Sequence, residues 1–336
     1  MSHALLPLAV SMGEPAGIGP DLILQLYADA SSNGAAPFVV FGQSGFLRAR
    51  AARLGLSVAI ETASLATAAS IFPVALPVIE IEGLVPDSPG EPTPVSAPVV
   101  LAAISGAVAA TLNAQCRALV TAPINKAVLY GAGFRYPGHT EYLAALCAKG
   151  GAPKLPVMML AHDDLRVVPL TVHVPLAAVP ALITAELINS TIRTLAHDLR
   201  TRFGVAAPKI AVAGLNPHAG ENGGIGRDEL DLIAPAIAEL RFAGLDVEGP
   251  FPADTLFYPA RWRQFDVVVA MYHDQALIPI KTIAFDSAVN VTLGLPIVRT
   301  SPDHGTAFDL AGTGKASASS FLAALRLADR LTAPHA

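Results

Sequence analysis

Three short apolar runs in this chain each end in a histidine, and such runs strongly limit the fold. They cover residues 165–173, 210–218 and 267–273. A short apolar run that ends at a turn predicts a buried strand. Similar runs alternate with helical segments along almost the whole chain. Because this alternation is typical of mostly parallel sheets with helices on both faces, we predict an α/β fold.

The order of the elements follows from the same patterns. We expect strands over residues 5–10, 38–42, 57–60 and 118–121, a hairpin over 157–161 and 165–173, and helices over 46–54, 99–112, 184–202 and 228–242. Prolines recur every few residues from 72 to 98, which predicts an irregular connection there.

The composition is apolar enough to raise the question of a membrane span. Hydrophobic residues make up 52% of the 336 residues and charged residues 15%. The longest uncharged stretch, 92–116, opens with prolines and continues with several polar residues. A spanning helix needs about 20 apolar residues in a row, so we predict a buried helix here and no membrane segment. The N-terminus shows no basic leader and two cysteines give no disulfide framework, so we expect a cytoplasmic protein.

The charge distribution limits the class of partner. The net charge is −5 and no basic stripe is present, which argues against nucleic acid. A small anionic substrate would still require local positive charge. The basic residues beside glycine- or proline-rich turns are Lys126, Arg135, Lys281 and Arg299.

The three strand-end histidines are His173, His218 and His273. In open α/β sheets, ligands bind beyond the carboxyl ends of the strands. Three neutral imidazoles meeting there would form a metal site with one position left open, which is the pattern of catalytic zinc. The alternative for each one is an isolated histidine with a satisfied hydrogen bond.

Several glycine-rich segments carry further candidate residues, although the Rossmann fingerprint and the Walker motif are both absent. The segment 12–21 (MGEPAGIGPD) is either a rigid turn or a ligand-binding loop. His139 and Thr140 fall at an expected helix N-terminus, where free N–H groups attract phosphate or carboxylate; a simple cap by Thr140 is the alternative. The segment 290–312 places its polar residues among small ones: Asn290, Arg299, Asp303, His304 and Asp309.

Eight sequence motifs, and the order in which they occur, resemble those of the 4-hydroxythreonine-4-phosphate dehydrogenase family. They are MGEPAGIGPD, TAPINK, PGHTE, LNPHAGE, ADTLF, MYHDQ, NVTLGLPIVRTS and DHGTAFDLAG, and they run from about residue 10 to 325. The resemblance implies a two-domain homodimer related to isocitrate and isopropylmalate dehydrogenases. Its active site would lie in the interdomain cleft at the subunit interface. The implied domains are 1–135 plus 280–336 for the nucleotide, and 136–279 for metal, substrate and dimerisation.

The resemblance also implies residue roles. His173, His218 and His273 would bind a divalent metal, with zinc expected and magnesium or cobalt as alternatives. The implied substrate-binding residues are His139, Thr140, Lys281, Asn290 and Arg299. The implied cofactor residues, for NAD or NADP, are Asp303, His304 and Gly305. Lys281 and Asp254 are both candidates for the general base, and a metal-bound hydroxide is a third.

The implied reaction is the oxidation of 4-phosphohydroxy-L-threonine to a β-keto acid, which decarboxylates to 3-amino-2-oxopropyl phosphate in pyridoxal 5'-phosphate biosynthesis. One alternative is a sister dehydrogenase for phosphorylated four-carbon sugar acids or aromatic dihydrodiols. Residues 275–281 (QALIPIK) favour the biosynthetic branch, because the sister enzymes tend to carry QGHGPVK there. The second alternative is a zinc hydrolase, since three histidines also activate water.

Overall fold

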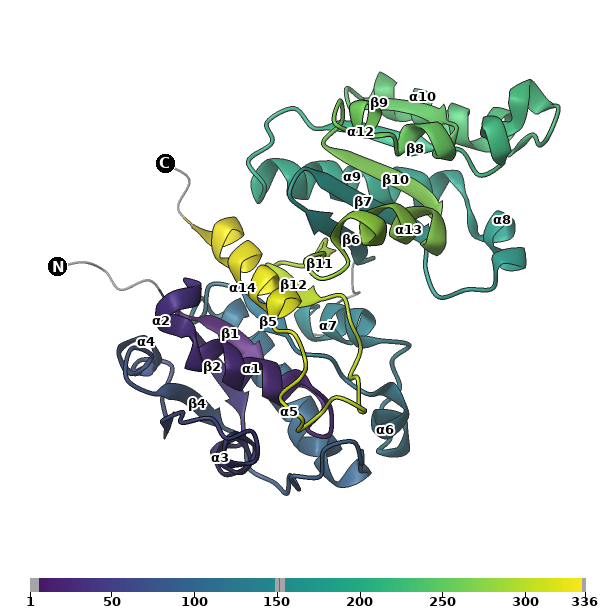
Figure 1. Cartoon of the computed structure of the whole chain (residues 1–336). Helices are drawn as coiled ribbons and strands as arrows, with labels where there is room; N and C mark the ends of the chain where they lie inside the picture. Colours follow the sequence, from purple (N-terminus) through teal and green to yellow (C-terminus); the bar gives the residue numbers. More distant parts are fainter. Residues whose placement is uncertain (1–5, 149–150, 152–154, 334–336) are drawn as a thin grey trace. The chain divides into compact units, whose positions relative to one another are not determined.

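The computed structural model describes residues 6–148, 151 and 155–333. These residues divide into two compact units (Figure 1). Unit 1 contains the residues up to Pro156 together with those from Leu295 onward, and unit 2 is Val157–Gly294. Both limits lie later in the chain than the expected domain limits at 135 and 280. The functions expected for the two parts stay predictions.

Unit 1 is built on a parallel sheet. Its strands are hydrogen-bonded in the order β3-β4-β2-β1-β5-β12, and every strand pair is parallel. The strands are β1 (Leu8–Ser11), β2 (Phe38–Gly42), β3 (Ile60–Thr62), β4 (Leu76–Glu80), β5 (Leu119–Thr121) and β12 (Arg299–Pro302). Strands β1, β2 and β5 are buried throughout, as their apolar sequences require.

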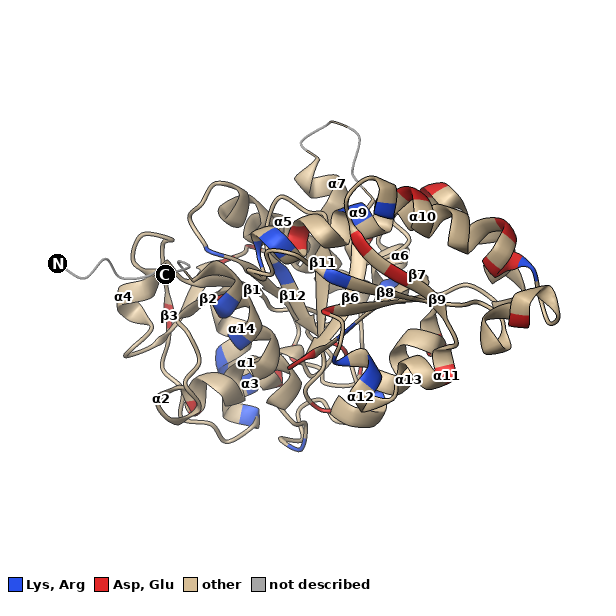
Figure 2. Cartoon of the chain, turned by 90° about the horizontal axis from the view of Figure 1, so that it is seen from above, with Lys and Arg blue, Asp and Glu red and all other residues tan. Residues whose placement is uncertain are grey.

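Helices cover both faces of this sheet (Figure 2). On one face lie α1 (Gly19–Ala28), α3 (Ser44–Arg53) and α14 (Ser319–Thr332), and on the other lies α5 (Ala97–Leu112). The shorter helices are α2 (Ala30–Asn33), α4 (Ala68–Ile71), α6 (Lys126–Gly131) and α7 (His139–Cys147). Helix α5 packs on β1, β2 and β5. The stretch Pro94–Leu112 is long and apolar enough to span a membrane, but 56% of its most apolar window is buried in the protein. The prediction of a buried helix is confirmed.

Unit 2 has a mixed sheet in the order β11-β6-β7-β10-β8-β9. Its strands are β6 (Val157–His162), β7 (Leu165–Thr171), β8 (Lys209–Ala213), β9 (Asp246–Phe251), β10 (Val267–Tyr272) and β11 (Val289–Leu293). Strands β6 and β7 form the expected antiparallel hairpin, and β11 pairs antiparallel with β6. The other pairs are parallel, so the prediction of mostly parallel sheets is confirmed.

Helices also cover both faces of the unit 2 sheet. Helices α9 (Ala185–Thr201) and α10 (Ala234–Phe242) lie on one face, and α13 (His273–Ala284) lies on the other (Figure 2). The short helices are α8 (Val179–Leu182), α11 (Ala253–Leu256) and α12 (Pro259–Trp262). Helix α13 starts directly at the carboxyl end of β10 and packs back on β7 and β10, so the first residue of this helix stands at the strand ends.

One expected element was wrong. Residues 72–98 are not irregular throughout, because β4 lies between β2 and β3 in the unit 1 sheet. The prolines concealed this strand. Pro77 lies one residue before Val78, where the register with β2 begins, so its missing N–H removes no bond from that register.

Candidate functional site

Two of the three strand-end histidines meet in unit 2. Strands β7 and β10 are parallel neighbours whose last paired residues are Thr171 and Tyr272. His173 follows the first strand and His273 follows the second, so both project from the same edge of the sheet. Their ring centroids are 5.4 Å apart. This arrangement follows from the parallel pairing, which brings the carboxyl ends of neighbouring strands together.

A neighbouring carboxylate orients one of these rings. Nδ1 of His273 lies 2.7 Å from Oδ1 of Asp274. A hydrogen bond of this kind fixes the tautomer and directs the other ring nitrogen outward, as in histidines that bind metals. The two histidines and Asp274 line a pocket of about 280 Å³ together with Thr171 and Tyr272. The pocket therefore presents two imidazoles and a carboxylate to one small space.

His218 does not join this pair. Within the described ranges of the chain, no three His, Cys, Asp or Glu side chains are grouped closely enough to hold a metal ion. His218 lies in the loop after β8, where residues 218–222 all have positive φ angles. Its side chain is exposed. One chain therefore brings together two of the three predicted ligands.

The loop that carries His218 is held in shape by a buried carboxylate. Glu229 is 3% exposed. Its Oε1 accepts hydrogen bonds from the backbone N–H groups of Leu215 and Asn216, both at 2.8 Å. Glu229 falls inside the helix predicted over residues 228–242, and nothing in the sequence indicates this role. A run of left-handed residues is costly for non-glycine side chains, so such contacts are needed to hold the loop.

Lys281 lies close to the histidine pair along α13. It is two helical turns after His273, with Leu277 between them on the same face of the helix. All three residues line a second, more open hollow of about 410 Å³, which Asp274 and Phe285 also line. Nζ of Lys281 lies 6.0 Å from the centre of the Phe285 ring. The hollow thus combines an imidazole with an ammonium group.

The two remaining unit 2 candidates differ in their surroundings. Asn290 is on β11, and its Oδ1 is buried without a hydrogen-bond partner in the described structure. A buried acceptor without a partner is costly unless a ligand donates to it. Asp254 is on α11, exposed, and lines neither of the two hollows.

The other predicted substrate residues lie together in unit 1. His139 is the first residue of α7 and Thr140 is the second. Arg299 begins β12, is 4% exposed, and donates from Nη2 to Oγ1 of Thr121 at 2.6 Å. Burial lowers the pKa of Arg299 to about 10. Burial first, and the positive charge of Arg299 second, hold the pKa of His139 well below its usual value.

These electrostatics favour a neutral His139 beside a charged Arg299. His139 is half-buried as a residue, yet its Nε2 is fully covered and has no hydrogen-bond partner in the described structure. A guanidinium beside the free N–H groups of a helix start attracts an anion. The pair is therefore suited to a phosphate or carboxylate group.

The predicted cofactor residues follow β12 in the same unit. His304 Nδ1 lies 3.0 Å from the carbonyl oxygen of Gly305, and its Nε2 is buried without a partner in the part of the chain that is described. The carbonyl of Thr306 accepts from the N–H of Ile18 at 2.9 Å. A side chain at Gly17 would lie 2.9 Å from that same carbonyl oxygen. The loop after β12 thus packs closely on the turn after β1.

The turn after β1 also contains a buried acid that is not among the predicted site residues. Glu14 is 1% exposed. Its Oε1 accepts from the N–H of Ala16 at 3.2 Å, while Oε2 has no hydrogen-bond partner in the described structure. Burial raises the pKa of Glu14, and the bond from Ala16 opposes that rise only in part. In the sequence, the position of Glu14 in a strand-end turn is the only feature that could have indicated a role for it.

Comparisons with known proteins agree with the sequence motifs. The family model described as pyridoxal phosphate biosynthetic protein PdxA matches residues 34–328. A 4-hydroxythreonine-4-phosphate dehydrogenase from Bradyrhizobium diazoefficiens is 51% identical over 340 residues, which is 99% of this chain and 99% of that protein. A crystal structure of the enzyme of that name from Klebsiella pneumoniae is 38% identical with a TM-score of 0.86, covering 97% of this chain and 99% of its own.

A second kind of dehydrogenase is also similar. The crystal structure of a terephthalate 1,2-cis-dihydrodiol dehydrogenase from Burkholderia xenovorans LB400 is 30% identical with a TM-score of 0.65. It covers 97% of this chain and 98% of its own. Its lower identity and lower TM-score set it further from this chain than the Klebsiella pneumoniae enzyme.

Proposed function

The chain belongs to the family of the pyridoxal phosphate biosynthetic protein PdxA, and on that premise we propose that it oxidises 4-phosphohydroxy-L-threonine with NAD or NADP. The product is a β-keto acid that loses carbon dioxide to give 3-amino-2-oxopropyl phosphate, a precursor of pyridoxal 5'-phosphate. A cytoplasmic location suits this role. The observation that carries the proposal is the pairing of His173 and His273 beside Lys281 in a member of this family.

We propose that the two histidines hold a divalent metal ion, with zinc favoured over magnesium or cobalt. Two imidazoles, one of them oriented by a carboxylate, are nitrogen donors suited to zinc. When bound, such an ion would lower the pKa of the substrate's secondary hydroxyl. His173 and His273 would then have to be neutral, and Asp274 would keep the latter ring in its binding orientation.

The third ligand in this proposal comes from a second copy of the chain. His218 is exposed on a loop of fixed shape, and the described part of one chain does not bring it to the other two histidines. In a symmetric homodimer, His218 of the partner subunit can complete the site, and each chain then supplies a ligand to both sites. A site shared across the subunit interface explains why one chain assembles only a pair.

The substrate's negative groups have two sets of receptors. In unit 1, Arg299, His139 and the start of α7 would bind one anionic group, with Thr140 donating its hydroxyl or N–H. In unit 2, Lys281 would hold or deprotonate a group close to His273, and the Oδ1 of Asn290 would accept from a substrate donor. The phosphate and the carboxylate are the two anionic groups of the proposed substrate.

The general base in this proposal is Lys281 rather than Asp254. Lys281 lines the same hollow as His273, so it can reach a hydroxyl held beside that ring. Asp254 is exposed and lines neither hollow.

The dinucleotide is proposed to bind in unit 1 at the loop after β12. Asp303, His304 and Gly305 would contact it, and the covered Nε2 of His304 is available for a hydrogen bond. When bound there, the dinucleotide would supply the acceptor for the hydride of the carbinol carbon. The turn after β1 holds this loop in its shape through the hydrogen bond from Ile18 to Thr306 and the close approach at Gly17.

A spectrophotometric assay tests the proposed function. NADH or NADPH formation should require both 4-phosphohydroxy-L-threonine and the divalent metal, and should stop when a chelator removes the ion. Absence of reduced nucleotide with this substrate, under conditions in which the protein is folded and metal-loaded, would refute the proposal.

The same assay decides between the two dehydrogenase candidates. The similarity to the terephthalate dihydrodiol dehydrogenase keeps the sister-enzyme alternative in the comparison. A higher kcat/KM with an aromatic dihydrodiol or a phosphorylated sugar acid would favour it. The three relatives described above carry the names of dehydrogenases, so they give no support to the hydrolase alternative.

A further inference from the structure

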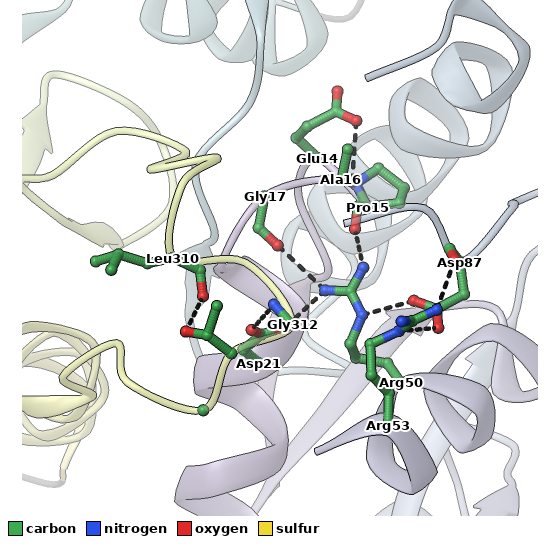
Figure 3. A network of polar contacts seen from close by, with 12 residues as sticks. Glu14, Pro15, Ala16, Gly17, Asp21, Arg50, Arg53, Asp87, Leu310 and Gly312 are labelled. Atoms are coloured by element: carbon green, nitrogen blue, oxygen red, sulfur yellow. Dashed lines mark hydrogen bonds and ion pairs between the residues drawn. The ribbon is translucent and has the colours of Figure 1, made fainter. Parts of the chain in front are cut away.

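A fully buried arginine lies at the centre of a polar network in unit 1. Arg50, on α3, is 0% exposed and is the largest side chain in the described structure with less than 2% exposure. Figure 3 shows its guanidinium directed at the turn after β1 and at Asp87. Its Nη2 donates to the carbonyl oxygen of Pro15 at 2.7 Å, and Nη1 donates to that of Gly17 at 3.3 Å.

Two carboxylates balance the charge of Arg50. Its Nε lies 2.6 Å from Oδ1 of Asp87, and its Nη1 forms an ion pair with Oδ1 of Asp21, which is 0% exposed. The second oxygen of Asp21 accepts from the N–H of Gly312 at 2.6 Å. The network therefore spans two separate segments, the turn after β1 and the loop after β12 (Figure 3).

The chemistry of this network indicates that it fixes the positions of the groups it binds rather than raising the stability of the fold. A buried ion pair has a large desolvation cost, and apolar residues of similar volume often give equal stability. A guanidinium presents five donors in a fixed plane, and here they bind the carbonyls of Pro15 and Gly17 together with the carboxylates of Asp21 and Asp87. Lysine could supply the charge but not the planar set of bonds.

We propose that Arg50 is a positioning residue for dinucleotide binding: it holds the 14–18 turn and, through Asp21, the 303–312 loop in their binding geometry. This inference rests on the proposed function, since it takes Asp303–Gly305 as the cofactor residues. Arg50 itself touches no substrate or cofactor atom in this role.

The test uses Arg50→Lys, with Arg48→Lys as the matched control on the same helix. Arg48 is exposed and donates to Ser44 and Ile60, away from both segments. We expect Arg50→Lys to raise the KM for the dinucleotide at least about tenfold, since misplacing a binding group by ~1 Å can cost on the order of 10²-fold. The KM for the phosphorylated substrate should change little. Hydrogen exchange at residues 303–312 should become faster, and the control should match the wild type in all three measurements.

Two outcomes overturn the inference. One is an unchanged dinucleotide KM and unchanged exchange in folded Arg50→Lys. The other is an equal rise of both KM values together with a lower Tm, which would mark a purely structural role. If Arg50→Lys does not fold, Asp87→Asn replaces it. This change removes the negative charge that pairs with Nε of Arg50 and leaves the arginine itself unchanged. If the wild type binds neither NAD nor NADP, the proposed function fails, and the exchange measurement alone still decides whether Arg50 positions the loop.

Discussion

The imidazole rings of His173 and His273 lie 5.4 Å apart, centre to centre, at the carboxyl ends of two neighbouring parallel strands. These residues are 100 positions apart in the sequence, and the pairing of β7 with β10 brings them together in space. If the pair holds a metal ion as proposed, the contact with Asp274 would fix the orientation of one of its two rings.

Replacing either ring should remove the metal and the activity together. We expect His173→Ala and His273→Ala to lose bound metal and to lower kcat/KM by at least about 10²-fold, since each removes a direct ligand. His197→Ala is the control, because His197 is an exposed histidine on α9. Metal content by atomic emission and initial rates check the prediction. Full metal occupancy in both variants would contradict it.

Mixing two inactive variants should restore activity. If His218 acts on the partner subunit's site, a dimer of one His218→Ala chain and one His273→Ala chain has one intact site and one doubly damaged site. Random exchange of subunits should then recover about a quarter of the wild-type activity. The measurement is the rate before and after subunit exchange. No recovery, with mixed dimers demonstrated by mass, would place all three ligands in one chain.

The histidine pair could be predicted from the sequence because each apolar run visibly ends at the residue concerned. The position of His218 could not, since it depends on a left-handed backbone from 218 to 222 that Glu229 supports from another segment. Propensity and periodicity say nothing about such a contact. The same limit applies to Arg50, whose partners come from two separate parts of the chain, residues 15–21 and Asp87.

The fold was predictable where the local pattern and the tertiary structure agree. The range 38–42 was expected as a strand and is β2, because every one of its residues is buried. Strand β4 was missed because Pro77 and the prolines around the strand indicate turns, and only its position between two strands makes the extended conformation favourable. Burial of Glu14 was also beyond reach, since an acid in a turn is ordinarily exposed.

Acid should destabilise the wild type through His139. The folded protein holds the pKa of His139 below its usual value of 6.5, so the unfolded state binds the proton more readily. The stability associated with neutral His139 is therefore lost as the pH falls below about 6.5. As the pH is lowered from 7 to 5, the free energy of unfolding of His139→Gln should rise relative to that of the wild type. Urea titration at each pH measures both values. His197→Gln serves as the exposed control, and parallel pH profiles for wild type and His139→Gln would count against the prediction.

Glu14 should give the opposite pH dependence. Its folded pKa lies above the usual 4.5, so the folded state binds the proton more readily than the unfolded state. Wild-type stability should fall as the pH rises from about 4.5 through the raised folded value. Glu14→Gln should therefore become more stable relative to wild type over that range, in the same urea titrations. Glu82→Gln, at an exposed site, is the control. A constant difference between Glu14→Gln and wild type at all pH values would rule out a buried, protonated carboxyl.

The assignment of the base rests on which group shares a hollow with His273. Lys281 does and Asp254 does not, so Lys281→Met should lower kcat by about 10²- to 10⁴-fold, the usual contribution of a general base. Asp254→Asn should stay within about twofold of wild type, as expected for an exposed carboxylate outside the site. Metal content must remain unchanged in both variants, so that the loss reflects proton transfer and not a damaged metal site. The reverse result, a large loss in Asp254→Asn and a small one in Lys281→Met, would show that Asp254 reaches the substrate and that Lys281 only contributes charge.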